Sequence, residues 1–368
     1  MSNKVPQLRF NGYSDAWEER KLGEVYKFQY GQFNNNPDNG GQYPIYGANG
    51  IIGGYNEYNA ENSIIIGHMG AYAGHVLWGD GRHFVTYNGT IGLENKKILD
   101  ARFGYYLTLS VNIPRLTAGS GQPFVSYSDL NGIKIVIPNL DEQQKIGVFF
   151  KQLDNTIALH QHKLDLLKEQ KKGYLQKMFP KNGAKVPELR FAGFADDWEE
   201  RKLIDIADRF DNLRVPITES DRKSGDTPYY GANGIQDYVE GFTHDGEFIL
   251  VAEDGANDLK NYPVQYVNGK VWVNNHAHVL QGKKTITDNK FLMNSIKNFN
   301  IEPFLVGGGR AKLNADVMMK LNILLPTFDE QEKIGSFFKQ LDETIDLHQR
   351  KLDLLKEQKK GLLQKMFV

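Results

Sequence analysis

The sequence contains no cysteine among its 368 residues. Disulfide bonds, a thiol nucleophile and a thiolate zinc site are therefore excluded. No stretch approaches the roughly 20 uninterrupted apolar residues of a membrane-spanning helix, and the first residues, Met1–Pro6, contain no apolar signal core. We therefore expect a soluble protein, most simply a cytoplasmic one.

The sequence also lacks an excess of charge of either sign. Its 44 Lys and Arg residues against 45 Asp and Glu residues give a net charge of −1. A strongly basic binder of polyanions would have a different balance, so any nucleic-acid role must come from local patches or from partner subunits. Extensive disorder is excluded by the 18 Tyr and 21 Phe residues, and the length predicts two or more domains.

An internal duplication determines the organisation of the chain. Three short motifs occur twice: Val5–Phe10 and Val186–Phe191, Trp17–Leu22 and Trp198–Leu203, Tyr46–Ile51 and Tyr230–Ile235. A longer segment, Leu140–Phe179, returns as Phe328–Phe367 with 33 of 40 positions identical. The regions between the motifs differ nearly everywhere. Two repeats of this size indicate a pseudo-symmetric molecule in which one element does the same task twice and the other does two different tasks.

The repeated long segments are predicted to be helices. Their apolar residues alternate in steps of three and four over about five heptads, which is typical of a coiled-coil seam. The predicted seam residues are Ile146, Phe150, Leu153, Ile157, Leu164, Leu167, Ile334, Phe338, Leu341, Ile345, Leu352 and Leu355. Capping boxes are expected at Asp141 with Gln144 and at Asp329 with Glu332. The alternative is that each helix packs on its own globular region.

The fold class is therefore α+β, with two pseudo-symmetric α/β domains joined by two long helices that pair as an antiparallel coiled coil. The expected boundaries are 1–139 for the first domain, 140–180 for the first helix, 181–327 for the second domain and 328–368 for the second helix. Within the domains, short apolar stretches separated by Gly, Asn and Pro predict strands, such as 63–67, 248–251, 133–138 and 321–326. Residues 101–111 and 288–299 are expected to be helical.

Two features of the domains are candidates for ligand recognition. The repeated Tyr-Gly-Ala-Asn-Gly-Ile motif is first of all a turn, because Asn-Gly suits positive φ, and it could present its tyrosine and asparagine to a ligand. A Gly-rich loop near the end of each domain carries Gln122 in the first copy and Arg310 in the second. Gln suits the edge of adenine and Arg the edge of guanine in the major groove, so the same loop could present a different base reader in each half.

The complete set of candidate ligand-binding residues lies on loops of both domains. In the first domain it comprises Tyr46, Asn49, His68, Tyr72, His75, Arg82, Asn88 and Gln122. In the second it comprises Tyr230, Asn233, Lys260, Asn274, Asn275, His276, Arg310 and Lys312. For any one of them, an ordinary polar residue on a surface loop is an equally good interpretation. The pair His276 and His278 has no evident third ligand, so no metal site is expected.

Taken together, these features resemble the specificity subunit of a type I restriction-modification enzyme. The resemblance covers the whole chain and depends on the order domain, repeated helix, domain, repeated helix. Its signatures are Tyr-Gly-Ala-Asn-Gly-Ile in both halves, Pro-x-Leu/Phe-Asp-Glu-Gln-x-Lys-Ile at the start of both helices, and Trp272–His278 in the second half. The combination is specific, although no single motif is.

The resemblance implies a function for each part. Each domain would read one half of a split site in double-stranded DNA, and the paired helices would set the spacer between the half-sites. Two methyltransferase subunits would dock on the helices, flip an adenine and methylate its N6 with S-adenosylmethionine. Restriction subunits driven by ATP, with Mg, would make the assembly a translocase and nuclease. From geometry alone, two modules on one rod would meet the duplex about one helical turn apart, ~34 Å.

The chain itself is expected to bind no cofactor and to catalyse nothing. It has no Asp/Asn-Pro-Pro-Tyr/Phe tetrapeptide, no P-loop and no convincing Pro-Asp…Glu-x-Lys nuclease core. Two alternatives remain open at this point. One is a diverged nuclease or methyltransferase, which predicts activity from the chain alone; the other is a scaffold with two ligand-binding domains on a coiled coil, which predicts no salt-dependent affinity for DNA.

Overall fold

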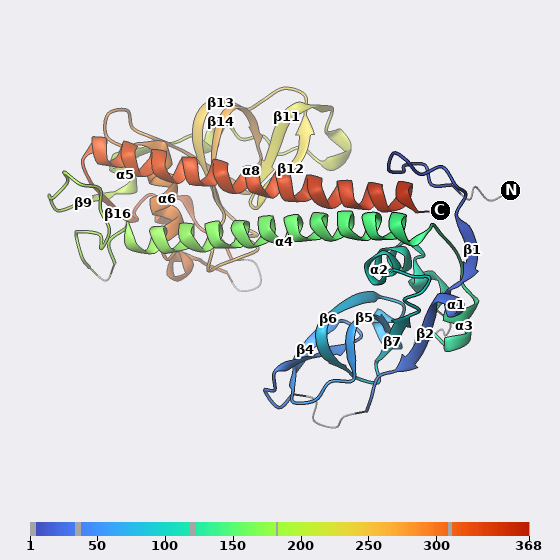
Figure 1. Cartoon of the computed structure of the whole chain (residues 1–368). Helices are drawn as coiled ribbons and strands as arrows, with labels where there is room; N and C mark the ends of the chain where they lie inside the picture. The colour runs from blue at the N-terminus through green and yellow to red at the C-terminus, as the bar shows by residue number, and fades with distance from the viewer. Residues whose placement is uncertain (1–4, 34–37, 118–122, 182, 308–310, 368) are drawn as a thin grey trace. The chain divides into compact units, whose positions relative to one another are not determined.

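The structure, a computed structural model, describes residues 5–33, 38–117, 123–181, 183–307 and 311–367. These residues form two compact units (Figure 1). Unit 1 consists of residues 1–161 together with 350–368, and unit 2 of residues 162–349. Each unit therefore combines one globular domain with the beginning of one long helix and the end of the other. Among the described residues, no helix is both long and apolar enough to cross a membrane.

Unit 1 contains a six-stranded sheet in the order β2-β7-β5-β6-β3-β4 and a two-stranded sheet, β1-β8. Its strands are β1 (Glu18–Lys21), β2 (Tyr26–Tyr30), β3 (Tyr43–Gly47), β4 (Gly50–Tyr55), β5 (Ala60–Gly67), β6 (Val76–Val85), β7 (Gly89–Glu94) and β8 (Lys134–Ile137). Its short helices are α1 (Leu22–Val25), α2 (Ala101–Ser110) and α3 (Tyr127–Gly132). All strand pairs are antiparallel except β3 with β6.

Unit 2 repeats this plan. Its six-stranded sheet has the order β10-β15-β13-β14-β11-β12, and β16 pairs with β9. The strands are β9 (Glu199–Lys202), β10 (Ala207–Arg209), β11 (Ser224–Gly231), β12 (Gly234–Val239), β13 (His244–Ala252), β14 (Val264–Val273), β15 (Ala277–Gly282) and β16 (Asn322–Leu325). The short helices are α5 (Leu203–Ile206), α6 (Asn289–Asn298) and α7 (Ala315–Met318). The strands and both short helices predicted from the sequence are confirmed.

The repeated segments are single long helices, α4 (Leu140–Lys177) and α8 (Phe328–Met366). Their side chains contact each other in antiparallel order within each unit. In unit 1, Asp154 of α4 pairs with Lys359 of α8 at 2.5 Å, and Gln161 accepts a hydrogen bond from Lys356. In unit 2 the equivalent partners are Asp342 with Lys171, and Gln349 with Lys168. The predicted pairing of the helices is therefore confirmed, and it occurs within one chain.

Two predictions for the long helices, a coiled-coil seam and packing on the globular domains, are each correct in part. Leu164 and Leu352 are buried, and the next seam positions on either side of them are half-buried. The first seam residues belong instead to the domain cores: Ile146 and Phe150 to that of unit 1, and Ile334 and Phe338 to that of unit 2. The beginning of each helix thus packs on its own domain.

An equivalent aromatic cluster joins the motifs of each repeat. In unit 1 it comprises Trp17, Phe103 of α2, Phe150 of α4 and Phe367, which follows α8, with Phe367 5.5–6.4 Å from the other three ring centroids. In unit 2 the same places are taken by Trp198, Phe291, Phe338 and Phe179. Because each fully buried aromatic ring contributes several kcal/mol, about 3–5 by truncation, this cluster explains why the repeated motifs are retained together.

The capping boxes expected at Asp141 and Asp329 are not formed. Helix α4 begins at Leu140, and the side chain of Asn139 accepts the backbone N–H of Glu142 at 3.0 Å. Helix α8 begins at Phe328, with the Glu330 N–H bonded to the carbonyl of Thr327. The helix starts expected at 140 and 328 coincide with those of α4 and α8; only the cap residues were assigned wrongly, because acidic residues favour both the cap and the first turn.

Glu142 and the glutamine beside it are fully buried and connect the helix to the domain. The Glu142 carboxylate accepts two hydrogen bonds from Arg9, at 2.7 and 2.8 Å. Gln143 accepts the N–H of Asp100 and donates to the carbonyls of Ile98 and Pro138. Unit 2 has the same bonds through Arg190, Glu330 and Gln331. The Asp-Glu-Gln motif therefore fixes the start of each helix on its domain.

Candidate nucleic-acid interface

Four segments of unit 1 meet at one edge of its large sheet, which we call loop edge 1. They are the turn 48–49, the loop 68–75, the turn 86–88 and the segment 123–125. The N–H of His68 donates to the Asn88 carbonyl, the Val125 N–H donates to the His68 carbonyl, and Met69 forms a β-bridge with Phe124. The turn joins through Ala48, which lies against Gly67. The Asn-Gly turn is confirmed, with Gly50 at φ +119°.

Aromatic side chains dominate loop edge 1. The ring of Tyr30 stacks on Tyr127 at 4.0 Å and lies 4.3 Å from His68. His68 is also bonded through Nδ1 to the Val125 carbonyl at 3.0 Å. Tyr72 packs edge-on against His75, and both are exposed. Exposed aromatic faces are suited to stacking on nucleic-acid bases or to packing against the sugar-phosphate backbone.

The equivalent segments of unit 2 form loop edge 2. They are the turn 232–233, the loop 253–263, the turn 274–276 and the segment 311–313. Asn233 donates to the Gly255 carbonyl and accepts the Asn257 N–H, both at 2.9 Å. The N–H of Glu253 donates to the His276 carbonyl, and the Leu313 N–H donates to the Glu253 carbonyl.

Charged side chains take the place of aromatic rings at loop edge 2. His278 Nδ1 lies 2.7 Å from an Asp211 oxygen, and Glu253 accepts from Arg214 at 2.7 Å and from Lys312 at 2.9 Å. We call Asp211, Arg214, Glu253, His278 and Lys312 the ion cluster. Burial opposes ionisation of Asp211 and Glu253, but their cationic partners outweigh it and lower the pKa of both carboxyl groups.

The ion cluster also bears on the metal prediction. Ligand atoms of Asp211, Glu253 and His278 lie within 4.8 Å of one another, so His278 does have acidic neighbours that the sequence did not reveal. Arg214 and Lys312 already contact Glu253, however, and both nitrogens of His278 face acceptors. The side chains therefore fit a salt-bridge cluster better than a metal site.

The predicted ligand-binding residues divide into three groups. Asn49, His68, Tyr72, His75 and Asn88 lie together on loop edge 1, and Asn233, Lys260, Asn275, His276 and Lys312 lie on loop edge 2. Buried or half-buried residues form the second group: Tyr46 in a core of unit 1, Tyr230 packed against a core of unit 2, and Asn274, which is 4% exposed and bonded to Gln236 and the His276 N–H. Gln122 and Arg310 lie outside the described residues.

Arg82, also a candidate ligand-binding residue, lies within β6 and away from loop edge 1. It pairs across the ladder with Glu61 near the beginning of β5, whereas the loop 68–75 follows the other end of that strand, where Ile66 pairs with Val76. At ~3.3 Å per residue, this separates Arg82 from loop edge 1 by most of the strand length. Its exposed guanidinium lies 3.6 Å from Glu61 and 4.8 Å from the ring centre of Tyr58.

Several residues of both edges escaped the sequence analysis. At loop edge 1 they include Tyr30 and Phe33, the latter 70% exposed and 5.5 Å from Tyr87. At loop edge 2 they are Asp211, Arg214 and Glu253. The aromatic residues could have been noticed in the sequence, because exposed rings near Gly and Asn turns are unusual. The acidic residues had no such signal, because Asp211 follows β10 and Glu253 follows β13, far apart in the sequence.

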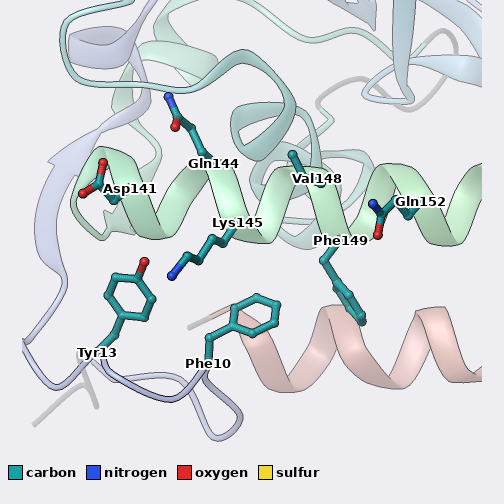
Figure 2. Close-up of a pocket in the computed structure, with 8 residues that line it drawn as sticks. All are labelled: Phe10, Tyr13, Asp141, Gln144, Lys145, Val148, Phe149 and Gln152. Atoms are coloured by element: carbon teal, nitrogen blue, oxygen red, sulfur yellow. The ribbon is translucent and has the colours of Figure 1, made fainter.

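A second duplicated feature lies at the start of each long helix. In unit 1, Phe10 and Tyr13 of the N-terminal segment face Lys145 and Phe149 of α4 and line a groove of about 550 Å³ (Figure 2). The Lys145 ammonium lies 4.8 Å from the ring centre of Tyr13, and the rings of Phe10 and Phe149 meet edge to face at 5.7 Å. Unit 2 has the same contacts through Phe191, Phe194, Lys333 and Phe337.

Comparisons with known proteins agree with this organisation. The family model for the type I restriction modification DNA specificity domain matches residues 14–169 and, separately, 195–357. A putative type I specificity subunit of Mycoplasma genitalium is 23% identical over 391 residues, covering 99% of this chain and 96% of its own length. A putative type I restriction enzyme specificity subunit of Haemophilus influenzae is 44% identical over 154 residues, which are 42% of this chain and 39% of that protein.

The fold is also that of a solved protein. The crystal structure of the S subunit of the type I restriction-modification system from M. genitalium superposes with a TM-score of 0.78 over 99% of both chains, at 18% identity. The two matched regions make up most of the sequence, so the chain belongs to the type I restriction-modification DNA specificity family. It is the non-catalytic DNA specificity subunit, with two target-recognition domains.

Proposed function

We propose that unit 1 reads one half of a bipartite site in double-stranded DNA and that unit 2 reads the other half. The observation that carries this proposal is the contrast between the two loop edges. Both are built from equivalent turns and loops on equivalent sheets, but loop edge 1 carries stacked and exposed aromatic rings, whereas loop edge 2 is held by the largely buried ion cluster, of which Lys312 is 45% exposed. One scaffold that carries two different sets of side chains suits the recognition of two different sequences.

The long helices have two roles in this proposal. They set the spacer between the half-sites, because the number of helical residues between the domains is fixed. They also dock two methyltransferase subunits, one for each repeat. The duplicated contacts at the helix starts support this second role, because a surface that is kept in both repeats suits two copies of one partner. Docking on a surface separate from the loop edges would leave these free for DNA.

Catalysis belongs to the partners of this chain. Methyltransferase subunits would supply S-adenosylmethionine and transfer its methyl group to adenine N6, and restriction subunits would use ATP and Mg to translocate and cut DNA. This chain would supply sequence recognition to both, in the cytoplasm where the DNA lies. Because its net charge is only −1, partner subunits would provide much of the contact with the phosphates.

Exchange of one domain tests the proposal. Residues 201–327 are replaced by the equivalent residues of another family member, the cognate methyltransferase is co-expressed, and methylated adenines are mapped. We expect one half-site to change completely while the other half-site and the spacer stay the same. A change in both half-sites, or in neither, would contradict the division of recognition between the units.

A further inference from the structure

The segment that closes loop edge 2 is held by paired backbone bonds. Val306 and Lys312 donate to and accept from each other's peptide groups, both at 2.9 Å, and Lys312 also forms a β-bridge with Asp254. Leu313, the next residue, donates its N–H to the Glu253 carbonyl at 2.7 Å. The position of Lys312 and Leu313 therefore depends on the strand end that carries Glu253 and Asp254.

The ion cluster contacts this same segment through side chains. His278 Nε2 lies 2.9 Å from the Leu313 carbonyl, and Lys312 Nζ lies 2.9 Å from Glu253. Arg214 connects the cluster to the neighbouring turn, because it donates to the Ala277 carbonyl at 2.9 Å as well as to Glu253. Three of the four segments that meet at loop edge 2, 253–263, 274–276 and 311–313, thus contain or bond to a member of the cluster.

His278 is held at both ring nitrogens. One nitrogen faces an Asp211 oxygen and the other faces the Leu313 carbonyl oxygen, so the ring connects two separate segments. The other charged groups that face it are Glu253, at 3.7 Å, and Arg214, which bonds to the same two carboxylates. With His278 only 1% exposed, these bonds are shielded from water.

Unit 1 holds the corresponding segment by different means. There, Met69 bridges to Phe124 and the Tyr30, His68 and Tyr127 rings stack beneath it, without a cluster of ion pairs among the described residues. The ion cluster is therefore specific to the second domain. Its geometry is also more demanding than that of stacked rings, because charge-assisted hydrogen bonds weaken steeply when their angles change.

We propose that Asp211, Arg214, Glu253 and His278 are positioning residues that orient residues 311–313 for the reading of the second half-site. They would act through these residues and not by touching bases. This inference rests on the proposed function, since it presupposes that loop edge 2 meets DNA. It goes further by assigning the accuracy with which the second half-site is read to the ion cluster, whose side chains are mostly buried.

The test uses the full chain in complex with its cognate methyltransferase and compares Glu253→Gln with the unaltered protein. Glutamine keeps the size of the side chain but removes the charge that Arg214 and Lys312 share. Methylation kcat/KM is measured on the cognate duplex and on duplexes with one base pair changed in either half-site. We expect discrimination at the second half-site to fall by about tenfold or more, and discrimination at the first to stay within about twofold.

Two further variants separate positioning from stability. Ile323→Val removes one methylene from β16 in the core of unit 2 and should lower the melting temperature without changing discrimination at either half-site. Asp211→Asn keeps the size of the side chain and can still accept the Val279 N–H, and it provides the same test if Glu253→Gln does not fold. Equal losses at both half-sites, or unchanged discrimination in a folded variant, would overturn the proposal. Failure of the unaltered complex to prefer any bipartite site would instead refute the proposed function.

Discussion

At the residue scale, the positions with the clearest physical constraint are buried polar side chains. Glu142 and Glu330 are fully buried and each is held by two hydrogen bonds from an arginine. The sequence showed that these glutamates and arginines recur, but it could not show that they bind each other, since they are 133 and 140 residues apart. Of the candidate site residues, Asn49 lies on a turn at loop edge 1, whereas Tyr46 is buried in a core of unit 1. The sequence did not show this difference, because burial is decided by tertiary packing.

Two buried histidines predict how stability depends on pH. Burial lowers the pKa of His83 in unit 1 and of His244 in unit 2. A histidine whose folded-state pKa is depressed stabilises the fold fully above its unfolded pKa, about 6.5, and that contribution is lost as the pH falls below this value. We therefore expect the free energy of unfolding to decrease between about pH 7.5 and pH 5.5.

Urea unfolding of His83→Gln at both pH values checks this expectation. The variant should lose less stability than the unaltered chain on acidification, because only His244 still resists protonation. His75→Gln is the matched control: His75 is exposed in the same domain, and its replacement should leave the decrease unchanged. An identical decrease in all three proteins would show that other groups set the pH dependence.

At the scale of elements, both long helices and most strands could be predicted, because the heptad pattern and the apolar runs are local signals. The residues that cap the helices could not, since Asn139 and Thr327 are followed by acidic residues that also favour a cap. The sequence also did not reveal where the phenylalanine at the end of each long helix packs. Phe179, after α4, enters the core of unit 2, and Phe367, after α8, enters the core of unit 1.

Glycine at two places in the helices provides a test of this packing. A Cβ added at Gly147 would lie 2.9 Å from both the Asp100 carboxylate and the Phe103 nitrogen at the start of α2, whereas one added at Gly361 would meet nothing within 4 Å. Gly361→Ala should stabilise the protein by about 1 kcal/mol, the ordinary gain in helix propensity. Gly147→Ala should destabilise it by about 1–2 kcal/mol, because backbone crowding exceeds that gain.

Denaturant midpoints of the two alanine variants, measured under the same conditions, give the comparison. Opposite signs support close packing of α2 on α4 at Gly147. Stabilisation by both substitutions would mean that α2 can move away from the helix at little cost, and that the bonds from Gln143 do not hold the domain on α4.

At the scale of the whole molecule, the duplication was the strongest signal in the sequence. It predicted two domains, two helices and their pairing, all of which the structure contains. The composition excluded a strongly basic DNA-binding protein, and the near-neutral charge agrees with recognition that depends on few side chains at two loop edges. Which bases these side chains meet does not follow from the sequence, because it depends on how several loops converge, as the ion cluster of unit 2 illustrates.

The central claim is that this chain directs adenine methylation to a bipartite site. Its most direct test is genome-wide mapping of N6-methyladenine in a host that expresses the cognate methyltransferase with or without this chain. We predict a two-part motif with a fixed spacer that appears only when the chain is present. Absence of new methylation, with both proteins soluble and bound to each other, would contradict the account and would favour a scaffold for ligands other than DNA.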